Sequence, residues 1–254
     1  MILAVDIGNT NIVLGGFGKD KVEFVERLST NHSATALEYT VMIRTTLEIN
    51  GISPEAFEGA ILSSVVPTIT DSVKKAVERA TGKTPLVLGP GIKTGLNIRL
   101  DNPAQLGSDR VADAVGAITY YPCPLIIVDM GTATTISAID KDRNFLGGMI
   151  IPGLQVSLDS LVNRTSQLPK ISLDAPEKVI GRNTVDCMKS GIIRYTASGI
   201  DGVIDKIEKE IGEPCTVVST GGLANIIIPY CERDIIIDEG LLLKGLMTIY
   251  NKNK

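Results

Sequence analysis

The hydrophobic pattern of the chain predicts short buried strands that alternate with amphipathic helices. Apolar runs between Gly-rich turns indicate strands, and apolar residues at helical spacing that end at Asn-Gly or Gly indicate helices. The strands expected on this basis are 2–5, 11–17, 21–28, 59–66, 85–88, 125–129, 134–139 and 216–219, and the helices are 34–49, 68–81, 104–121, 183–211 and 239–250. Such alternation is typical of an α/β protein.

The second half of this pattern repeats the opening. Residues 125–132 and residues 3–10 share an apolar strand, an Asp at its end and then x-Gly-x-Thr. Because the two copies lie about half the chain apart, a duplicated unit explains them. The helix breaker Pro122-Cys123-Pro124 lies at the middle of the chain. We therefore expect two lobes, residues 1–121 and 122–254.

Composition narrows the function classes. The chain has 254 residues, of which 44% are apolar and 21% are charged, so it can bury a substantial core. Its formal net charge of -4 and its scattered Lys and Arg residues predict no nucleic-acid partner. No export signal opens the sequence and no apolar run is long enough to span a bilayer. We expect a cytoplasmic protein with no membrane partner.

Histidine and cysteine usage excludes further chemistry. The single histidine, His32, lies in a polar turn, so Ser-His-Asp chemistry would depend on this residue alone and a multi-histidine metal site is excluded. The cysteines have no C-x-x-C spacing and are expected to be reduced and mostly buried; they are Cys123, Cys187, Cys215 and Cys231. Catalysis must then rest on carboxylates, hydroxyls and backbone amides.

The repeated Asp-x-Gly motif suits a phosphate and metal site. A tight hairpin turns backbone N–H groups toward phosphate oxygens, and the Asp holds the cation. Two such loops can face one nucleotide. Asp and Gly also form ordinary turns, but the repetition favours a functional role. The sequence contains no Walker A loop and no G-x-G-x-x-G unit, which excludes the P-loop and Rossmann classes.

A third motif, Gly107-Ser108-Asp109-Arg110, lies between the two loops at the expected start of a helix. There the backbone amides and the helix dipole suit an anionic ligand. Taken alone, Asp109 is also typical of a first-turn acid and Arg110 of a solvated cation.

Together these motifs resemble, in order, those of the type III pantothenate kinases, a family of the actin-like superfamily that includes sugar kinases, acetate kinase and chaperone ATPases. The matching segments are 6–11, 102–103, 107–110, 129–135, 147–148, 152–153 and 181–184, and 219–224 resembles the adenosine motif of the superfamily. The resemblance covers nearly the whole chain. It implies a duplicated actin-like (ribonuclease H-like) ATPase fold, with a mixed sheet flanked by helices in each lobe.

The resemblance also implies an activity. It is the transfer of the ATP γ-phosphoryl group to the primary hydroxyl of pantothenate, which yields 4'-phosphopantothenate in the first step of coenzyme A biosynthesis. The implied cofactors are ATP with Mg²⁺ and a monovalent cation, K⁺ or NH₄⁺, and the implied assembly is a homodimer. Two alternatives are a non-catalytic ATP-binding regulator of the same fold and a kinase of another small hydroxyl substrate.

Residue roles follow from the resemblance position by position. Asp109 is implied as the catalytic base, and Asp6 as a Mg²⁺ ligand, directly or through water. Asp129 is implied as the ligand of the monovalent cation. The implied ATP-binding residues are Asp6, Ile7, Gly8, Asn9, Thr10, Asn11, Ile12, Val13 and Thr132, and the implied substrate-binding residues are Gly107, Ser108, Asp109, Arg110 and Thr184.

The sequence departs from the family pattern at Leu100, where a tyrosine is common just before the segment 101–103. An apolar wall can still pack against the substrate there, without the hydrogen bond of the tyrosine. Met130 and Ser108 stand where phenylalanine and alanine are common, and these are mild changes.

Overall fold

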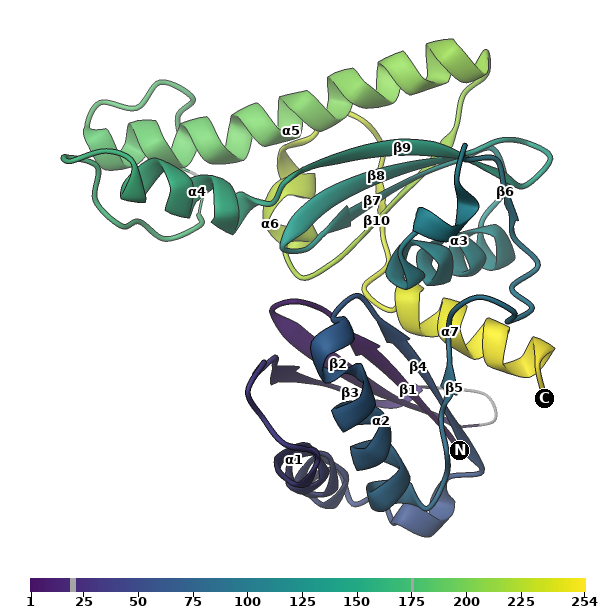
Figure 1. Cartoon of the computed structure of the whole chain (residues 1–254). Helices are drawn as coiled ribbons and strands as arrows, with labels where there is room; N and C mark the ends of the chain where they lie inside the picture. Colours follow the sequence, from purple (N-terminus) through teal and green to yellow (C-terminus); the bar gives the residue numbers. More distant parts are fainter. Residues whose placement is uncertain (19–21, 175) are drawn as a thin grey trace. The chain divides into compact units, whose positions relative to one another are not determined.

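A computed structural model describes residues 1–18, 22–174 and 176–254, and the chain forms two compact units (Figure 1). The first unit comprises 1–96, 102–119 and 241–254, and the second comprises 97–101 and 120–240. We expected one boundary, between residues 121 and 122, and two segments depart from that expectation. The C-terminal helix α7 (Leu241–Lys252) packs on strands of the first sheet, and the short strand β6 (Asn97–Ile98) pairs with a strand of the second sheet.

The first unit is built on a five-stranded sheet with the order β3-β2-β1-β4-β5. Its strands are β1 (Ile2–Ile7), β2 (Asn11–Phe17), β3 (Val22–Ser29), β4 (Gly59–Ser64) and β5 (Leu86–Val87). β1, β2 and β3 pair antiparallel as a meander, whereas β4 and β5 continue the sheet in parallel pairing. The strand expected at 21–28 has its first residue outside the described ranges.

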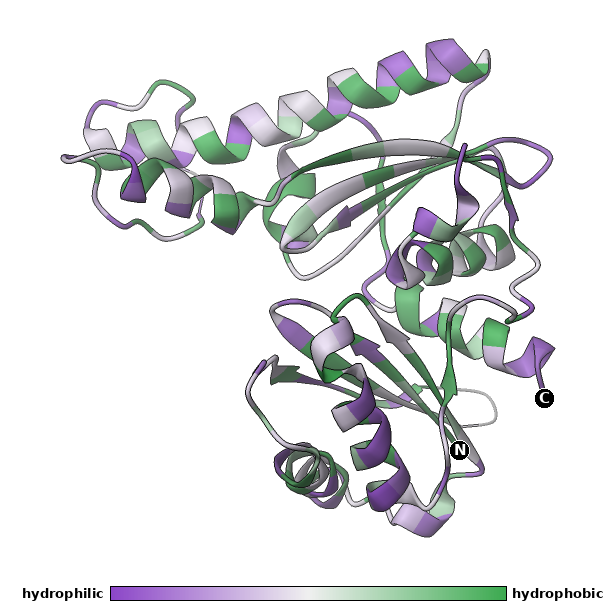
Figure 2. Cartoon of the chain, in the orientation of Figure 1, coloured by the Kyte–Doolittle hydropathy of each residue, from purple (hydrophilic) through white to green (hydrophobic). Residues whose placement is uncertain are grey.

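Helices α1 (Ala36–Ile49) and α2 (Pro67–Thr81) cover one face of this sheet. The alternating residues Leu3, Val5 and Ile7 of β1 form a buried cluster with apolar side chains of both helices. α1 begins with a capping box, in which Thr35 and Glu38 bond each other's backbone N–H groups. Figure 2 shows hydrophilic residues along the outer surface of α2, as an amphipathic helix requires.

The helix α3 (Ser108–Tyr120) belongs to the first unit in all but its last residue and meets α7 through glycines. A Cβ atom added at Gly116 would lie 2.5 Å from the carbonyl oxygen of Leu241, and one added at Gly245 would lie closer still to the carbonyl oxygen of Ala112. We expected this helix at 104–121, but it begins four residues later, at Ser108. The short helix η2 (Pro103–Gln105) precedes it, because the Asn102 side chain accepts a hydrogen bond from Ala104 N–H at 3.2 Å and closes a separate turn.

The second unit is built on a six-stranded sheet with the order β11-β10-β7-β8-β9-β6. Its further strands are β7 (Leu125–Met130), β8 (Ala133–Ile139), β9 (Asn144–Pro152), β10 (Thr216–Thr220) and β11 (Ile236–Ile237). The helices are α4 (Leu154–Asn163), α5 (Thr184–Ile211) and α6 (Ala224–Ile227), and the short helices η1 (Pro54–Ala56, in the first unit) and η3 (Ile228–Tyr230) complete the chain. Ile126, Val128 and Met130 pack against apolar residues of α5 and α6.

Both sheets contain the same five-strand arrangement, which confirms the duplicated fold. The order β9-β8-β7-β10-β11 repeats β3-β2-β1-β4-β5 with the same antiparallel and parallel pairings. The two central hairpins differ by one residue. Ile7 pairs with Ile12 around the first loop, but Met130 pairs with Thr134 around the second, which is one residue shorter.

Two further features concern solvent exposure. Cys187 is exposed and the other cysteines are half-buried, so the expectation of mostly buried thiols is wrong; Cys187 lies in the first turn of α5, where most side chains face solvent. Within the described residues, none of the helices combines the length and the hydropathy that crossing a bilayer requires.

Candidate active site

The first Asp-x-Gly loop is a tight hairpin held by Thr30. Asp6 is the penultimate residue of β1 and is half-buried on the face opposite the Leu3 cluster. In the loop, Gly8 N–H donates to the Asn11 carbonyl at 3.0 Å. Thr30 bonds the loop twice, through its hydroxyl to the Gly8 carbonyl at 2.7 Å and through its N–H to the Thr10 carbonyl at 2.9 Å. These bonds fix the shape of the loop tip.

The predicted ATP-binding residues of this loop differ in exposure. Asn9, Thr10 and Asn11 are exposed, whereas the Ile7 and Ile12 side chains are 0% and 1% exposed in the core. Val13 is half-buried beside Asp6 in the strand pairing. Ile7 and Ile12 can therefore meet a ligand only through their backbone, while the exposed tip offers polar side chains.

The hydroxyl of Ser108 attaches the start of α3 to the end of β4. Its Oγ lies 3.1 Å from Ser64 N–H and 2.9 Å from the Ser64 carbonyl, to which it donates. It also lies 3.0 Å from the Ser63 hydroxyl. β4 is the parallel neighbour of β1, with Ser63 in register with Asp6. The structure thus brings the 107–110 motif and the first loop together within one unit.

Asp109 and Arg110 follow in the first turn of α3. Asp109 Oδ1 accepts the Arg110 N–H at 2.7 Å, and its carboxylate folds back against Gly107 so closely that a Cβ atom there would collide with it. Both side chains are half-buried. Burial lowers the pKa of Arg110, and the charges of Asp109 and Asp113 oppose that shift. A cation that is partly removed from water in this way suits a carboxylate ligand.

The second loop is built in the same manner within the other unit. Gly131 N–H donates to the Ala133 carbonyl at 3.0 Å, and Gly153 N–H donates to the Thr132 carbonyl at 3.1 Å. A side chain at Gly153 would collide with this loop, because a Cβ atom there would lie 2.5 Å from the Gly131 carbonyl oxygen. The Thr132 side chain is exposed at the loop tip.

Asp129 lies against the segment that resembles the adenosine motif. It pairs in register with Thr220 of β10, and the following Gly221 adopts a left-handed φ of 89°. A Cβ atom at Gly221 would lie 2.5 Å from Asp129 Oδ1, so only glycine leaves room for the carboxylate. Leu223 N–H donates to the Met130 carbonyl at 3.2 Å and closes the contact.

Thr184 is the first residue of α5, and its side chain is exposed. The Asn183 side chain caps the helix by accepting the Asp186 N–H at 2.9 Å. Leu100, which replaces the tyrosine of the family pattern, is half-buried and lies beside Gly147 of β9, where an added Cβ atom would be 3.5 Å from Leu100 Cδ2.

The residues that sequence reasoning missed are Thr30, Ser63, Ser64 and Gly153. Each lies far along the chain from the segment that it contacts, and no local pattern marks Thr30, Ser63 or Ser64. Gly153 alone carried a signal, because Pro152-Gly153 matches a family motif, although the sequence does not reveal its role against Thr132.

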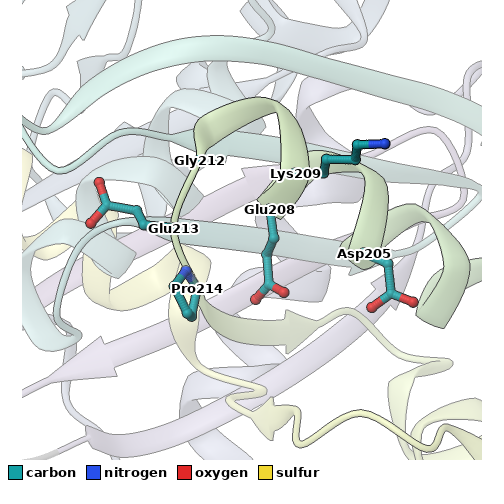
Figure 3. Close-up of a pocket in the computed structure, with 6 residues that line it drawn as sticks. All are labelled: Asp205, Glu208, Lys209, Gly212, Glu213 and Pro214. Atoms are coloured by element: carbon teal, nitrogen blue, oxygen red, sulfur yellow. The ribbon is translucent and has the colours of Figure 1, made fainter.

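A pocket of about 440 Å³ lies elsewhere in the second unit (Figure 3). It is lined by Asp205, Glu208, Lys209, Gly212, Glu213 and Pro214, at the end of α5, and includes none of the predicted site residues. Arg233 forms ion pairs of 2.7 Å with both Asp205 and Glu208. These ion pairs join α5 to the segment before β11, so Asp205 and Glu208 have a structural role.

The residues fit the expected cations. In the described part of the chain, no three His, Cys, Asp or Glu side chains gather as a metal-binding group. Mg²⁺ keeps several waters and is often held by one or two carboxylates with substrate phosphates, so the single half-buried carboxylate of Asp6 is compatible with it. Asp129 offers a second half-buried carboxylate, for which the absence of a side chain at Gly221 leaves room.

Comparison with solved structures identifies the fold of the chain. A structure from Campylobacter jejuni described as a Baf family transcriptional activator matches with a TM-score of 0.60 and 23% identity, over 99% of this chain and 98% of that one. A structure from Listeria monocytogenes described as an N-acetylmannosamine kinase matches with a TM-score of 0.54 and 12% identity, over 100% of this chain and 99% of that one. The fold is that of the actin-like ATPases and sugar kinases.

Sequence comparison then shows the family. The family model of the type III pantothenate kinases matches residues 2–206. Type III pantothenate kinases from Exiguobacterium sp. and Halalkalibacterium halodurans are 42% and 41% identical to this chain, over the full length of all of them. The chain belongs to the type III pantothenate kinase family, whose members are kinases of coenzyme A biosynthesis.

Proposed function

We propose that the chain transfers the γ-phosphoryl group of ATP to the primary hydroxyl of pantothenate, with Asp109 as the base that accepts the hydroxyl proton. One observation carries the assignment of the base. The first turn of α3, which holds Asp109, is bonded to Ser63 and Ser64 of β4, directly beside the strand that carries Asp6. A fixed carboxylate next to a phosphate loop supplies the positioning on which phosphoryl transfer depends.

The same turn supplies the substrate contacts. We assign Gly107, Asp109 and Arg110 to pantothenate, with the Arg110 guanidinium paired to the substrate carboxylate. The half-burial of Arg110 supports this role, because a partly desolvated cation binds an anion more strongly than one in water. Thr184, exposed at the start of α5, is assigned a polar contact to the substrate, and Leu100 an apolar one.

ATP is bound by the two loops. The loop from Gly8 to Asn11 cradles phosphate oxygens through backbone N–H groups and the Thr10 hydroxyl, and Thr132 does so at the tip of the second loop. The exposure of Thr10 and Thr132 supports these contacts, and the burial of Ile7 and Ile12 restricts these two to backbone contacts. The turn at Gly221 is assigned to the adenosine moiety.

Two cations neutralise phosphate charge. Asp6 holds Mg²⁺, directly or through water, and Asp129 holds a monovalent cation, K⁺ or NH₄⁺. When bound, these ions neutralise charge on the β- and γ-phosphates. The half-burial of both carboxylates at strand ends, next to hairpins with inward-turned backbone, supports the assignment.

The assembly that we propose is a homodimer in the cytoplasm. Exposed apolar side chains on β9, α4 and α5 offer a surface that a second copy would bury; they include Met149, Ile150, Ile151, Val156, Leu161 and Tyr195. Ile150 is 68% exposed to solvent, and its neighbours on β9, Met149 and Ile151, are exposed as well.

A coupled ADP-release assay tests the reaction. ATP and Mg²⁺ are supplied with and without pantothenate, in potassium and then in sodium buffer. Turnover that requires pantothenate supports the reaction, and a further requirement for potassium supports the cation at Asp129. ADP release only with another hydroxyl substrate would favour a related kinase, and ATP binding without any release would favour the non-catalytic regulator.

A further inference from the structure

The hydroxyl of Ser108 has its hydrogen-bonding capacity filled inside the first unit. A serine hydroxyl has one donor and two acceptor positions. Ser108 uses the donor on the Ser64 carbonyl at 2.9 Å, and it accepts the Ser64 N–H at 3.1 Å. Because its only proton is then used, the contact of 3.0 Å with Ser63 requires Ser63 to donate. No position of the Ser108 hydroxyl remains for a substrate.

These bonds take the place of a strand. β5 accompanies β4 only as far as Leu62, where the Leu62 carbonyl accepts the Leu88 N–H at 2.7 Å. The next residue along β4 whose N–H and C=O point to that side is Ser64, and the Ser108 hydroxyl bonds both groups. Where the pairing with β5 ends, the Ser108 side chain of α3 therefore satisfies the backbone groups of β4 that a neighbouring strand would otherwise bond.

The link reaches the first phosphate loop. Ser63 is 0% exposed and is the register partner of Asp6, and Ser64 is the partner of Ile7, whose carbonyl accepts the Val65 N–H at 3.1 Å. A chain of paired groups therefore runs from Asp6 through Ser63 to Ser108, which precedes Asp109 directly. The separation between the carboxylates of Asp6 and Asp109 depends on this chain.

We infer that Ser108 is a positioning residue, which fixes Asp109 relative to the Asp6 loop through Ser63 and Ser64. It is then not the substrate contact that the family resemblance implies, and in this chain its replacement of the common alanine is not a mild change. This inference rests on the proposed role of Asp109 as the base. Displacement of a catalytic group by about 1 Å can reduce turnover by about 100-fold, so a bond that sets this distance acts on kcat more than on KM.

Steady-state kinetics of Ser108→Ala measure the effect. Alanine lacks the hydroxyl but is otherwise close to serine in size. The Ser64 N–H and C=O groups then lose this hydrogen-bonding partner, so the start of α3 can shift. We expect kcat to fall about tenfold, with the KM values for pantothenate and ATP changed less than about twofold. A raised KM for pantothenate with unchanged kcat would make Ser108 a substrate contact, and unchanged kinetics would remove any positioning role.

A cycle with Asp109→Asn separates this inference from the role of the base. If Ser108 acts through Asp109, adding Ser108→Ala to Asp109→Asn lowers kcat no further, whereas multiplying losses would overturn the inference. Full turnover in Asp109→Asn would instead refute the base. Thr81→Val is the matched control, since it removes a buried hydroxyl of α2 in the same unit. It should lower the melting temperature and leave kcat unchanged.

Discussion

The backbone of Gly221 packs against the carboxylate of Asp129, and this contact joins two segments that are about 90 residues apart in sequence. Asp129 is the penultimate residue of β7, which belongs to the repeated motif, whereas Gly221 follows the neighbouring strand β10. The left-handed φ of 89° and the 2.5 Å available to a Cβ atom each favour glycine at this position. Any side chain there would move the carboxylate proposed to hold a cation.

Gly221→Ala should therefore impair both stability and turnover. The left-handed conformation alone costs an alanine about 1–2 kcal/mol, and crowding against Asp129 and Met130 adds about 1–3 kcal/mol. We expect the free energy of unfolding, measured by urea denaturation, to fall by the sum of these terms. We also expect kcat/KM for ATP to fall at least about tenfold, because the carboxylate is displaced.

Gly212→Ala is the control for the backbone conformation. Gly212 ends α5 with a φ of 91°, and no atom lies within 4 Å of a Cβ atom built there. This variant should lose only the about 1–2 kcal/mol of the left-handed conformation and keep its kinetics. Equal losses in the two variants would mean that the contact with Asp129 has no role of its own.

Asp109→Asn tests the proposed base. Asparagine keeps the size of the side chain but cannot accept the hydroxyl proton, so kcat should fall at least about 100-fold. Binding of ATP, measured by calorimetry, should stay within about threefold of the wild-type value, because the proposed ATP contacts lie in other segments. Asp71→Asn removes an exposed carboxylate of α2 in the same unit and should leave both quantities unchanged. Wild-type turnover in Asp109→Asn would exclude Asp109 as the base.

Asp129→Asn tests the cation site. Loss of the negative charge should weaken cation binding, so KM for ATP should rise about tenfold and the difference between potassium and sodium buffers should disappear. Initial rates over a potassium titration measure both effects. A variant that keeps the full potassium response would place the monovalent cation elsewhere.

The parts of the fold that sequence patterns predicted are those fixed by local chemistry. The strand β2 has the expected bounds, Asn11–Phe17, because a Gly-containing turn and an apolar run define it locally. α2 ends at Thr81 as expected, since Gly82 adopts a φ of 70° and closes the helix. The repeated Asp-x-Gly strands predicted the duplication of the two sheets for the same reason.

The parts that were missed depend on partners far along the chain. β6 has only two residues, and its pairing with Asn144 and Phe145 of β9 defines it as a strand. β9 contains Gly147 and Gly148, which weaken a strand signal. The start of α3 and the role of Ser108 likewise depend on Asn102 capping and on β4, so no local periodicity reveals them.

The hydrogen bond between Tyr121 and Asp238 predicts a stability that depends on pH. The Tyr121 hydroxyl donates to Asp238 Oδ2 at 2.8 Å, and Asp238 is buried and also accepts the Gly240 N–H at 3.1 Å. Burial, together with this carboxylate, raises the pKa of Tyr121 to about 12. An unfolded tyrosine ionises near pH 10, so the contribution of the bond is complete below about pH 10 and is lost as the pH rises toward about 12.

Tyr121→Phe should make this dependence visible. The hydrogen bond to a charged group contributes about 1.5–3 kcal/mol, so the variant should be less stable than the wild type by this amount at about pH 8. The gap in the free energy of unfolding should narrow above about pH 10, since the wild type alone loses this contribution there. Tyr195→Phe, at a side chain that is 81% exposed, should show no gap at either pH. Urea titrations from about pH 8 to 11 measure these differences, and a Tyr121→Phe gap that stays constant over that range would contradict the role of the ionising hydroxyl.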